Sequence, residues 1–358
     1  MPQNLGYLCN AIGRMSEEAT PKRRIKIPRH VRRILSVGVL IFIFEYLVIP
    51  QFGTAKKSLH LLSDVNPVLL ALAVLVEAAA IASYSELTRT VFTPHAPKRF
   101  DTNRINLSTL ALSHVLPGGT APASALSYRL FSDAGVPAST NAFGLAAQGS
   151  GSAVVLNIIF WIALVISIPL RGFNPAYGFA ALAGVFLMLA FFGTIALLTR
   201  GQHRADAWLR ATVGRLPRVN PETITRLLTH VAERITMLTS NRAILWTSLG
   251  WAAANWLLDA TSLWIFVYAF GYALSPIDLL VAFGLANVLA VVPITPAGLG
   301  LIEFILIPTI VGFGVPQQAA TLAVLAYRFV NFWLPIPLGG LAYLSLEWRR
   351  GKKPTPNG

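Results

Sequence analysis

A short Pro/Gly signature occurs twice in this chain, and the two copies are a fixed 179 positions apart. The copies are Pro117-x-Gly119 followed by Gly135-Val136-Pro137, and Pro296-x-Gly298 followed by Gly314-Val315-Pro316. Proline and glycine determine the path of the backbone, so the repetition predicts a repeated local geometry. Both copies lie inside hydrophobic segments, and paired Gly/Pro interruptions of membrane spans point to the central site of a transporter.

The composition places the chain in a membrane. Its mean hydropathy is +0.60, and 54% hydrophobic against 12% charged residues exclude an ordinary soluble protein. Several apolar runs exceed the roughly 18–20 residues that cross a bilayer. We therefore predict an all-α polytopic membrane protein.

Cysteine and histidine usage argues against a metal centre. Cys9 is the single cysteine, which excludes a disulfide framework and a cysteine-based metal site. The six histidines show no close pairing with one another or with carboxylates. We expect no metal ligand and no cofactor.

The net charge of +14 is concentrated beside the apolar runs. Residues 1–33 carry eight Lys/Arg, residues 200–242 carry eight Arg, and the tail 347–358 is also basic. Basic residues next to membrane spans report orientation and attraction to anionic lipid headgroups. The expected partners are therefore membrane lipids with anionic headgroups, and not nucleic acid.

Two segments are interrupted by the Pro/Gly signature and are too short to span on either side of it. Residues 106–116 and 121–131 would each form a helix of about 16 Å, roughly half of the ~30 Å hydrocarbon core. Residues 277–292 and 301–311 flank the second break at 293–300. We predict two re-entrant helical hairpins, because such backbone is tolerated at depth only where protein or a wet cavity surrounds it.

The basic segments set the predicted topology. Full spans are expected at 34–52, 67–91, 137–170, 175–199, 243–270 and 317–346. With a cytoplasmic N-terminus, this count places all three basic segments on the cytoplasmic face. The second and fifth spans then run in opposite directions, so the two halves form an inverted repeat. A competing count treats each hairpin as one or two full crossings, which gives up to ten spans.

This topology divides the chain simply. A basic cytoplasmic extension, 1–33, precedes a single transmembrane domain over 34–346. Within that domain, repeat one covers about 67–170, a cytoplasmic amphipathic linker covers 200–242, and repeat two covers about 243–346. A basic cytoplasmic tail, 347–358, follows. The protein is expected in the cytoplasmic membrane with both termini cytoplasmic.

The second signature resembles a known sequence element. It runs Pro293-Ile294-Thr295-Pro296-Ala297-Gly298-Leu299-Gly300-Leu301-Ile302-Glu303 and resembles Pro-Gly-Gly-x-Gly-x-x-Glu. Together with the Gly-Val-Pro triplet that follows and Arg328, it resembles the lysylphosphatidylglycerol synthase/flippase transmembrane-region family. The resemblance implies the lipid-translocating membrane half, without the aminoacyltransferase domain. The first half departs from the family pattern, because Thr120 replaces a Glu and Arg129 comes several residues late, so the lipid stays open.

Ionisable residues at membrane depth cost at least ~2.5–3.5 kcal/mol each and mark candidate sites. Glu303 follows the second break within one turn, and Arg328 lies in the next span. We expect them to approach each other, either around a lipid headgroup or as a structural pair that fixes the hairpin to the last span. Arginine suits a phosphate because its planar donors bind oxygens bidentately, and Arg129 could supply a second such contact.

The hairpin breaks are themselves candidate binding positions. Half-helix N-termini after Gly119 and Gly298 would present free N–H groups to an anion, with Thr120 and Thr295 adding hydroxyls. The alternative is that these glycines only permit close helix approach.

Two further acids are candidates for proton or cation coupling. The repeat offset places Asp259 opposite Ala80, which is three positions beyond Glu77 and on the same helix face. Related positions on inverted elements could both face a central cavity, although two acids solvated near the interface would show the same pattern.

The predicted function is a flippase-like transporter that moves a phospholipid or polyprenyl-linked lipid between leaflets of the cytoplasmic membrane. Two alternatives stay open: a secondary transporter of a small anion or amphipathic solute, and a non-catalytic membrane partner of a lipid-modifying enzyme. No catalytic residue is predicted, because the sequence has no nucleophile–base pairing, metal cluster or phosphate-cradling loop.

Overall fold

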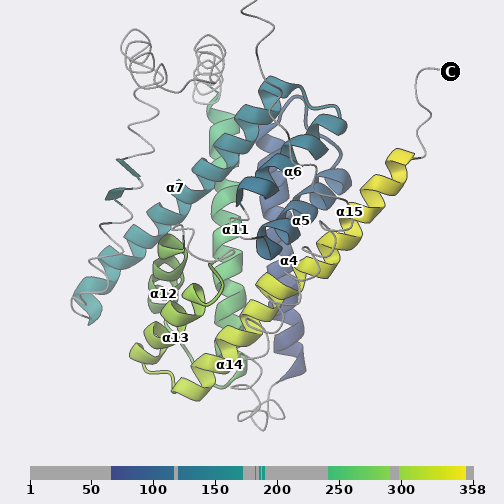
Figure 1. Ribbon diagram of the computed structural model, residues 1–358. Coiled ribbons are helices and arrows are strands. Elements are labelled where there is room, and N and C mark those ends of the chain that lie inside the picture. The colour runs from purple at the N-terminus through teal and green to yellow at the C-terminus, as the bar shows by residue number, and fades with distance from the viewer. Residues whose placement is uncertain are drawn as a thin grey trace, which may run out of the picture. The chain divides into compact units, whose positions relative to one another are not determined.

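The computed structural model describes residues 66–116, 120–171, 241–290 and 298–351, with isolated positions between 182 and 189 (Figure 1). Regular structure in these ranges is helical throughout, without a strand. The elements are α4 (Pro67–Val91), α5 (Arg99–Val115), α6 (Thr120–Asp133), α7 (Ala138–Arg171), α11 (Arg242–Ala269), α12 (Pro276–Leu289), α13 (Leu301–Gly312), α14 (Gln317–Arg328), the π-helix η4 (Phe329–Trp333) and α15 (Pro335–Gly351).

Three of the described helices are long and apolar enough to cross a membrane. They cover Pro67–Val91, Ala138–Pro169 and Gln317–Arg349, the last running through η4. These match three of the predicted spans. α11 covers the predicted span 243–270 as one helix of 28 residues, although tryptophans and polar side chains keep its hydropathy below that of the three. The span predicted at 34–52 lies outside the described residues, as does the span predicted at 175–199 apart from isolated positions.

Local signals explain where several helices begin. Asn66 accepts a hydrogen bond from Val68 N at 2.9 Å, and Pro67 occupies the first turn of α4. Ser275 caps α12 in the same way through Asp278 N at 3.1 Å. α5 differs from the prediction: it begins at Arg99, seven residues before the expected hairpin arm at 106.

The turns after α6 and α13 have the same geometry. Gly135 and Gly314 have φ of 91° and 99°, a left-handed conformation that favours glycine. Their N–H groups donate to Ser132 O at 3.0 Å and Val311 O at 2.9 Å, which are related by the same 179-residue offset. The buried valine that follows each glycine donates back to the preceding helix in both copies.

Helices from the first part of the chain pack against helices from the second part. α4 lies along α11 in the most extensive helix contact, α5 packs on α15, and α7 packs on α12. Glycine permits the close approach in the last two pairs. Gly339 of α15 lies against the backbone of Leu107, and Gly284 of α12 lies against the ring of Phe160.

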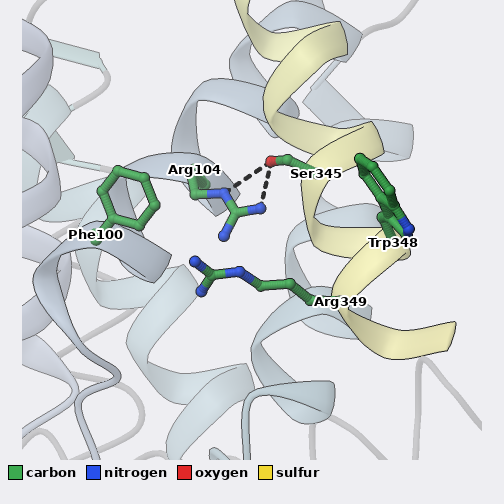
Figure 2. A pocket seen from close by; sticks show the side chains of 5 residues that line it. All are labelled: Phe100, Arg104, Ser345, Trp348 and Arg349. Atoms are coloured by element: carbon green, nitrogen blue, oxygen red, sulfur yellow. Dashed lines mark hydrogen bonds between the residues drawn. The ribbon is translucent and has the colours of Figure 1, made fainter. Parts of the chain in front are cut away.

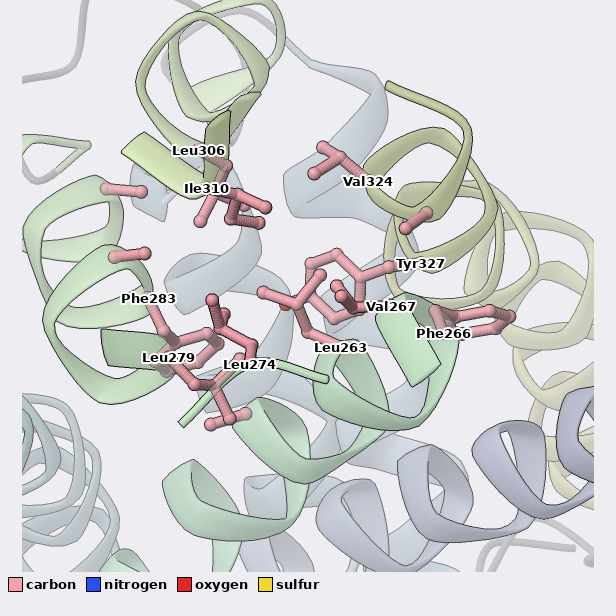
Figure 3. Close-up of a cluster of buried hydrophobic side chains, with 14 of the residues drawn as sticks. Leu263, Phe266, Val267, Leu274, Leu279, Phe283, Leu306, Ile310, Val324 and Tyr327 are labelled. Atoms are coloured by element: carbon pink, nitrogen blue, oxygen red, sulfur yellow. The ribbon is translucent and has the colours of Figure 1, made fainter. Parts of the chain in front are cut away.

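The larger hydrophobic core lies among α11, α12, α13 and α14 (Figure 3). Leu263, Phe283, Leu306 and Ile310 are essentially inaccessible within it. Large apolar side chains are also exposed on the outer faces of the long helices, including Leu75 of α4 at 67%. Such faces are expected where a helix contacts lipid.

Candidate functional site

Four buried ionisable side chains from four helices belong to one polar network. Glu77 lies on α4, Asp259 on α11, Glu303 on α13 and Arg328 at the end of α14. Each is more than nine-tenths buried. Charges removed from water to this degree are stable only when paired or hydrogen-bonded, so the contacts of each group define what the site can do.

Glu303 and Arg328 form a buried ion pair. The Nε of Arg328 donates to Oε1 of Glu303 at 2.7 Å, and the side chains are 3% and 9% exposed. The approach of these two residues that the sequence predicted is therefore present. The other oxygen, Oε2, accepts from the N–H of Gly300 at 2.7 Å, at the beginning of α13. The carboxylate thus occupies the helix N-terminus, a position suited to an anion.

Glycines at the second break make this arrangement possible. Gly298 and Gly300 have φ of 71° and 81°, which other residues rarely adopt. Gly298 is also tightly surrounded: a Cβ there would lie 3.1 Å from that of Ala290 and 2.9 Å from Ile302. This close approach agrees with the packing alternative for Gly298, while Gly300 presents its N–H to the carboxylate.

Arg328 has further contacts on the side away from Glu303. Its Nη1 donates to Oδ1 of Asn331 at 3.4 Å, and the guanidinium lies over the ring of Phe332, 4.8 Å from its centroid. Its Nη2 is buried and has no hydrogen-bond partner within the described parts of the chain. One donor of the guanidinium thus remains available inside the protein.

Asn331 connects the ion pair to the two acids on the long helices. Its Nδ2 donates to Oε1 of Glu77 at 2.8 Å and to Oδ1 of Asp259 at 3.2 Å. The hydroxyl of Tyr327 donates to the same Asp259 oxygen at 2.7 Å. Oε2 of Glu77 is buried without a partner among the residues that the structure describes. Glu77 and Asp259 therefore meet at one amide rather than being solvated separately.

The π-helical turn places these polar groups on the network. η4 covers Phe329–Trp333 and includes Asn331 and Phe332. Single π-turns inside longer helices often occur at functional sites, because they redirect side chains and loosen the hydrogen-bond ladder. His114 of α5 also reaches this turn: its Nδ1 lies 2.9 Å from the carbonyl oxygen of Phe332, and the two rings stack at 4.4 Å.

The network carries more acid than fixed positive charge. It contains three carboxyl groups and one guanidinium, so the uncharged amide of Asn331 and the hydroxyl of Tyr327 must support the remaining acids. The described residues hold no cluster of three potential metal ligands. The surplus of carboxyl groups suits the binding of a proton or another cation.

Other predicted site residues lie elsewhere. Arg129 is 53% exposed and pairs with Glu347 at 2.8 Å and Asp133 at 3.8 Å, so it belongs to an ion-pair group apart from Arg328. Thr120 is exposed at the first residue of α6. Gly119 and Thr295 lie outside the described residues.

Sequence reasoning missed Asn331 and Tyr327. The signal was the run Tyr327-Arg328-x-x-Asn331, which places three polar groups within five positions of an apolar span. Several polar side chains close together in an apolar span predict a hydrogen-bonded network, because each needs a hydrogen-bond partner at such depth.

Apolar helices that enclose a charged network define an integral helical membrane protein with an internal polar site. The chain belongs to the family described as Lysylphosphatidylglycerol synthase TM region, which matches residues 31–339.

Curated relatives are membrane proteins as well. Two matches to UPF0104 membrane proteins of Methanothermobacter thermautotrophicus are 30% identical over 139 residues and 24% identical over 161 residues. They cover 37% and 43% of this chain, and 41% and 48% of the relatives. A UPF0104 membrane protein of Methanocaldococcus jannaschii is 28% identical over 99 residues, which is 28% of this chain and 30% of that protein. The matches thus span less than half the length of these relatives.

Proposed function

We propose that the protein is a flippase-like transporter that moves a phospholipid or polyprenyl-linked lipid between the leaflets of the cytoplasmic membrane. The observation that carries this proposal is the position of the Glu303 carboxylate. One of its oxygens accepts a hydrogen bond from the N–H of Gly300, and the other accepts one from Arg328. A headgroup phosphate presents similar oxygens and suits the same donors. The family's description refers to lysylphosphatidylglycerol, which supports a lipid substrate.

An inverted repeat would provide the two exposures that transport requires. In support, each helix of the first half has a counterpart 179 residues later. α4, α5, α6 and α7 correspond in this way to α11, α12, α13 and the continuous α14–η4–α15. Their bounds agree within a few residues except where α12 ends before the second break.

The helix contacts support the same proposal. Exchanging the two halves turns the α5–α15 contact into the α12–α7 contact, and both are present. The contacts α4–α7 and α11–α14 exchange in the same way, as do α5–α6 and α12–α13. α4 and α11 exchange with each other, so their interface would contain the symmetry axis. Glu77 and Asp259 contribute one acid from each side of that interface.

The short helices beside the breaks suit re-entrant hairpins. α6 and α12 have 14 residues each and α13 has 12, which gives about 18–21 Å per helix against a core of ~30 Å. Hairpins entering from opposite faces, six full spans and cytoplasmic termini complete the proposed architecture. It keeps the two breaks near the middle of the membrane.

In the proposed cycle, a headgroup enters beside one hairpin while its acyl chains stay in lipid. Its phosphate displaces Glu303 from Arg328 and Gly300, and Glu303 returns when the headgroup leaves on the other side. The unused Nη2 of Arg328 adds a further donor for the phosphate. The bonds of the lipid stay intact, so the proposed role is not enzymatic, and a separate lipid-modifying enzyme would supply the substrate.

Glu77 and Asp259 are the proposed coupling groups. A proton held between two carboxyl groups that share one amide would remove one buried charge and stabilise the closed network. Loss of that proton would favour opening of α4 from α11. Lipid movement would then depend on a proton gradient.

A charge swap tests the site against the structural alternative. The variant Glu303→Arg/Arg328→Glu retains an ion pair but removes the anion-binding donor from its position. In proteoliposomes with fluorescent phospholipids, we expect the swap to restore the unfolding temperature relative to either single variant while transport stays at the level of empty vesicles. Restored transport would show that the pair is only a brace. A wild-type protein that leaves both labelled and native lipids on their starting leaflet would contradict the flippase assignment itself.

A further inference from the structure

A cavity lined by two arginines lies at the ends of two packed helices, apart from the buried network. It has a volume of about 340 Å³ and lies between the beginning of α5 and the end of α15. Its lining residues are Phe100, Arg104, Ser345, Trp348 and Arg349 (Figure 2). None of them contributes to the Glu303–Arg328 network.

One guanidinium of the cavity is fixed in place. Arg104 is 8% exposed, and its Nε donates to Oγ of Ser345 at 2.8 Å, with a second contact from Nη2 to the same oxygen. Its Nη1 lies 3.5 Å from Oδ1 of Asp101. The contact with Ser345 joins α5 to α15, so the position of this cation depends on both helices.

The second guanidinium is largely exposed. Arg349 has a side chain that is 67% exposed, and its Nη1 lies 3.6 Å from the same Asp101 oxygen. Figure 2 shows the guanidinium groups of Arg104 and Arg349 near each other beside Phe100. Two cations thus share one carboxylate through long contacts, which leaves one positive charge in excess at the cavity.

Aromatic side chains make the cavity suitable for a lipid. Phe100 is 63% exposed and Trp348 is 73% exposed. The guanidiniums of Arg104 and Arg349 lie 5.2 and 5.9 Å from the Phe100 centroid. Arg349 is also the last residue of the candidate span Gln317–Arg349, so the cavity lies where that helix would leave the hydrocarbon. Exposed tryptophan at such a level is typical of the membrane interface.

We propose that this cavity binds the phosphate of an anionic phospholipid at the membrane surface. The two guanidiniums supply planar donors to the phosphate oxygens. Phe100 and Trp348 contact the glycerol region and the upper acyl chains. The bound lipid would join α5 to α15, one helix from each half of the chain. This site does not depend on transport, because it uses neither Glu303 nor Arg328.

Native mass spectrometry of the detergent-solubilised full chain tests the proposal. The protein is titrated with phosphatidylglycerol, with phosphatidylcholine of the same acyl chains, and with inorganic phosphate. We expect one tightly retained phosphatidylglycerol that phosphatidylcholine does not replace, and about fivefold weaker retention in Arg349→Gln, since one Lys/Arg near a lipid surface contributes about that factor. Arg349 is exposed, so this variant leaves the helix packing intact.

Arg99→Gln is the matched control. Arg99 precedes Phe100 on α5, its side chain is 73% exposed and pairs with Glu86 at 3.0 Å, and it does not line the cavity. It should retain phosphatidylglycerol as the wild type does. Equal retention in Arg349→Gln and wild type, or equal loss in Arg99→Gln and Arg349→Gln, would overturn the proposal. Displacement of the lipid by inorganic phosphate at equal concentration would assign the cavity to the free ion and also overturn it.

Discussion

Asn331 hydrogen-bonds to three of the four ionisable side chains of the buried network. One amide nitrogen serves both Glu77 and Asp259, while its oxygen accepts from Arg328. An aspartate in its place would add a fourth carboxyl group, and an apolar residue would leave two acids without this donor. The amide is therefore the only common side chain of this size that can connect an arginine on one side to two carboxyl groups on the other.

Asn331→Leu should lower the stability of the protein more than the same substitution at an asparagine that bonds within its own helix. A buried polar group that loses its partner costs about 1–3 kcal/mol. The substitution removes the donor to Glu77 and one of two donors to Asp259, which keeps the Tyr327 hydroxyl. Thermal unfolding in detergent measures the effect. Asn287→Leu is the matched control, because within the described ranges Asn287 bonds only to Phe283 O of its own helix. Equal losses for the two variants would contradict the central role of Asn331.

Arg328→Met should destabilise more than Glu303→Gln/Arg328→Met. The single variant leaves the Glu303 carboxylate buried without its cation, and removal of one partner from a buried pair costs about 3–5 kcal/mol. The double variant replaces the charge with an amide that still accepts from Gly300. Chemical denaturation of both variants in the same detergent gives the comparison. A double variant as unstable as the single one would mean that the guanidinium contributes mainly through Asn331 and Phe332.

At the scale of the elements, the two left-handed turns should respond alike. Gly135→Ala and Gly314→Ala each place a Cβ on a residue with φ near 90–100° but with no heavy atom within 4 Å, so backbone strain alone acts. We expect a loss of about 1–2 kcal/mol at each. Gly149→Ala in α7 also adds a Cβ in open space, at a helical position, and should be neutral or stabilising. Unequal losses at the two turns would count against their equivalence.

Alanine substitutions at two adjacent glycines of α15 distinguish the effect of helix packing from the effect of helix propensity. A Cβ at Gly339 would meet the backbone carbonyl of Leu107 and the methyl group of Ala111, whereas a Cβ at Gly340 would meet nothing within 4 Å. Gly339→Ala should therefore force α15 away from α5 and lower the unfolding temperature. Gly340→Ala should leave the unfolding temperature unchanged or raise it. If both variants unfold at the same temperature, the close contact of Gly339 with α5 does not limit the stability of the protein.

At the scale of the whole molecule, the sequence predicted features that depend on neighbouring residues better than features that depend on contacts between distant segments. The helix after the second break begins at Leu301 as expected, because Gly300 and Glu303 define its start within the sequence. The predicted start of the first arm was wrong. The predicted arm began at 106, yet the helix begins at Arg99. Arg99 pairs with Glu86 of α4 and Arg104 bonds to Ser345, 241 positions away, and the second contact is one that a local pattern does not reveal. The role of Asn331 likewise depends on a π-turn that no local pattern specifies.

The orientation of the two halves decides whether the repeat is inverted. The loop after α4 contains His95 and the loop after α11 contains Ala273; both residues are exposed, and the two loops follow corresponding helices. An inverted repeat places these loops on opposite faces of the membrane, because their helices run in opposite directions. A parallel repeat, or a first hairpin that crosses the membrane once, places them on the same face.

Cysteine labelling distinguishes these arrangements. In a Cys9→Ser background, which removes the single native cysteine, His95→Cys and Ala273→Cys are each treated in intact cells with a membrane-impermeant maleimide. We expect Ala273→Cys to react from outside and His95→Cys to react only after the membrane is opened, since the basic segments favour a cytoplasmic loop after α4. A Thr93→Cys variant should follow His95→Cys, which excludes a local effect of one position. Reaction of both loops from the same side would remove the inverted repeat, and with it the alternating exposure by which Arg328 is proposed to meet both leaflets.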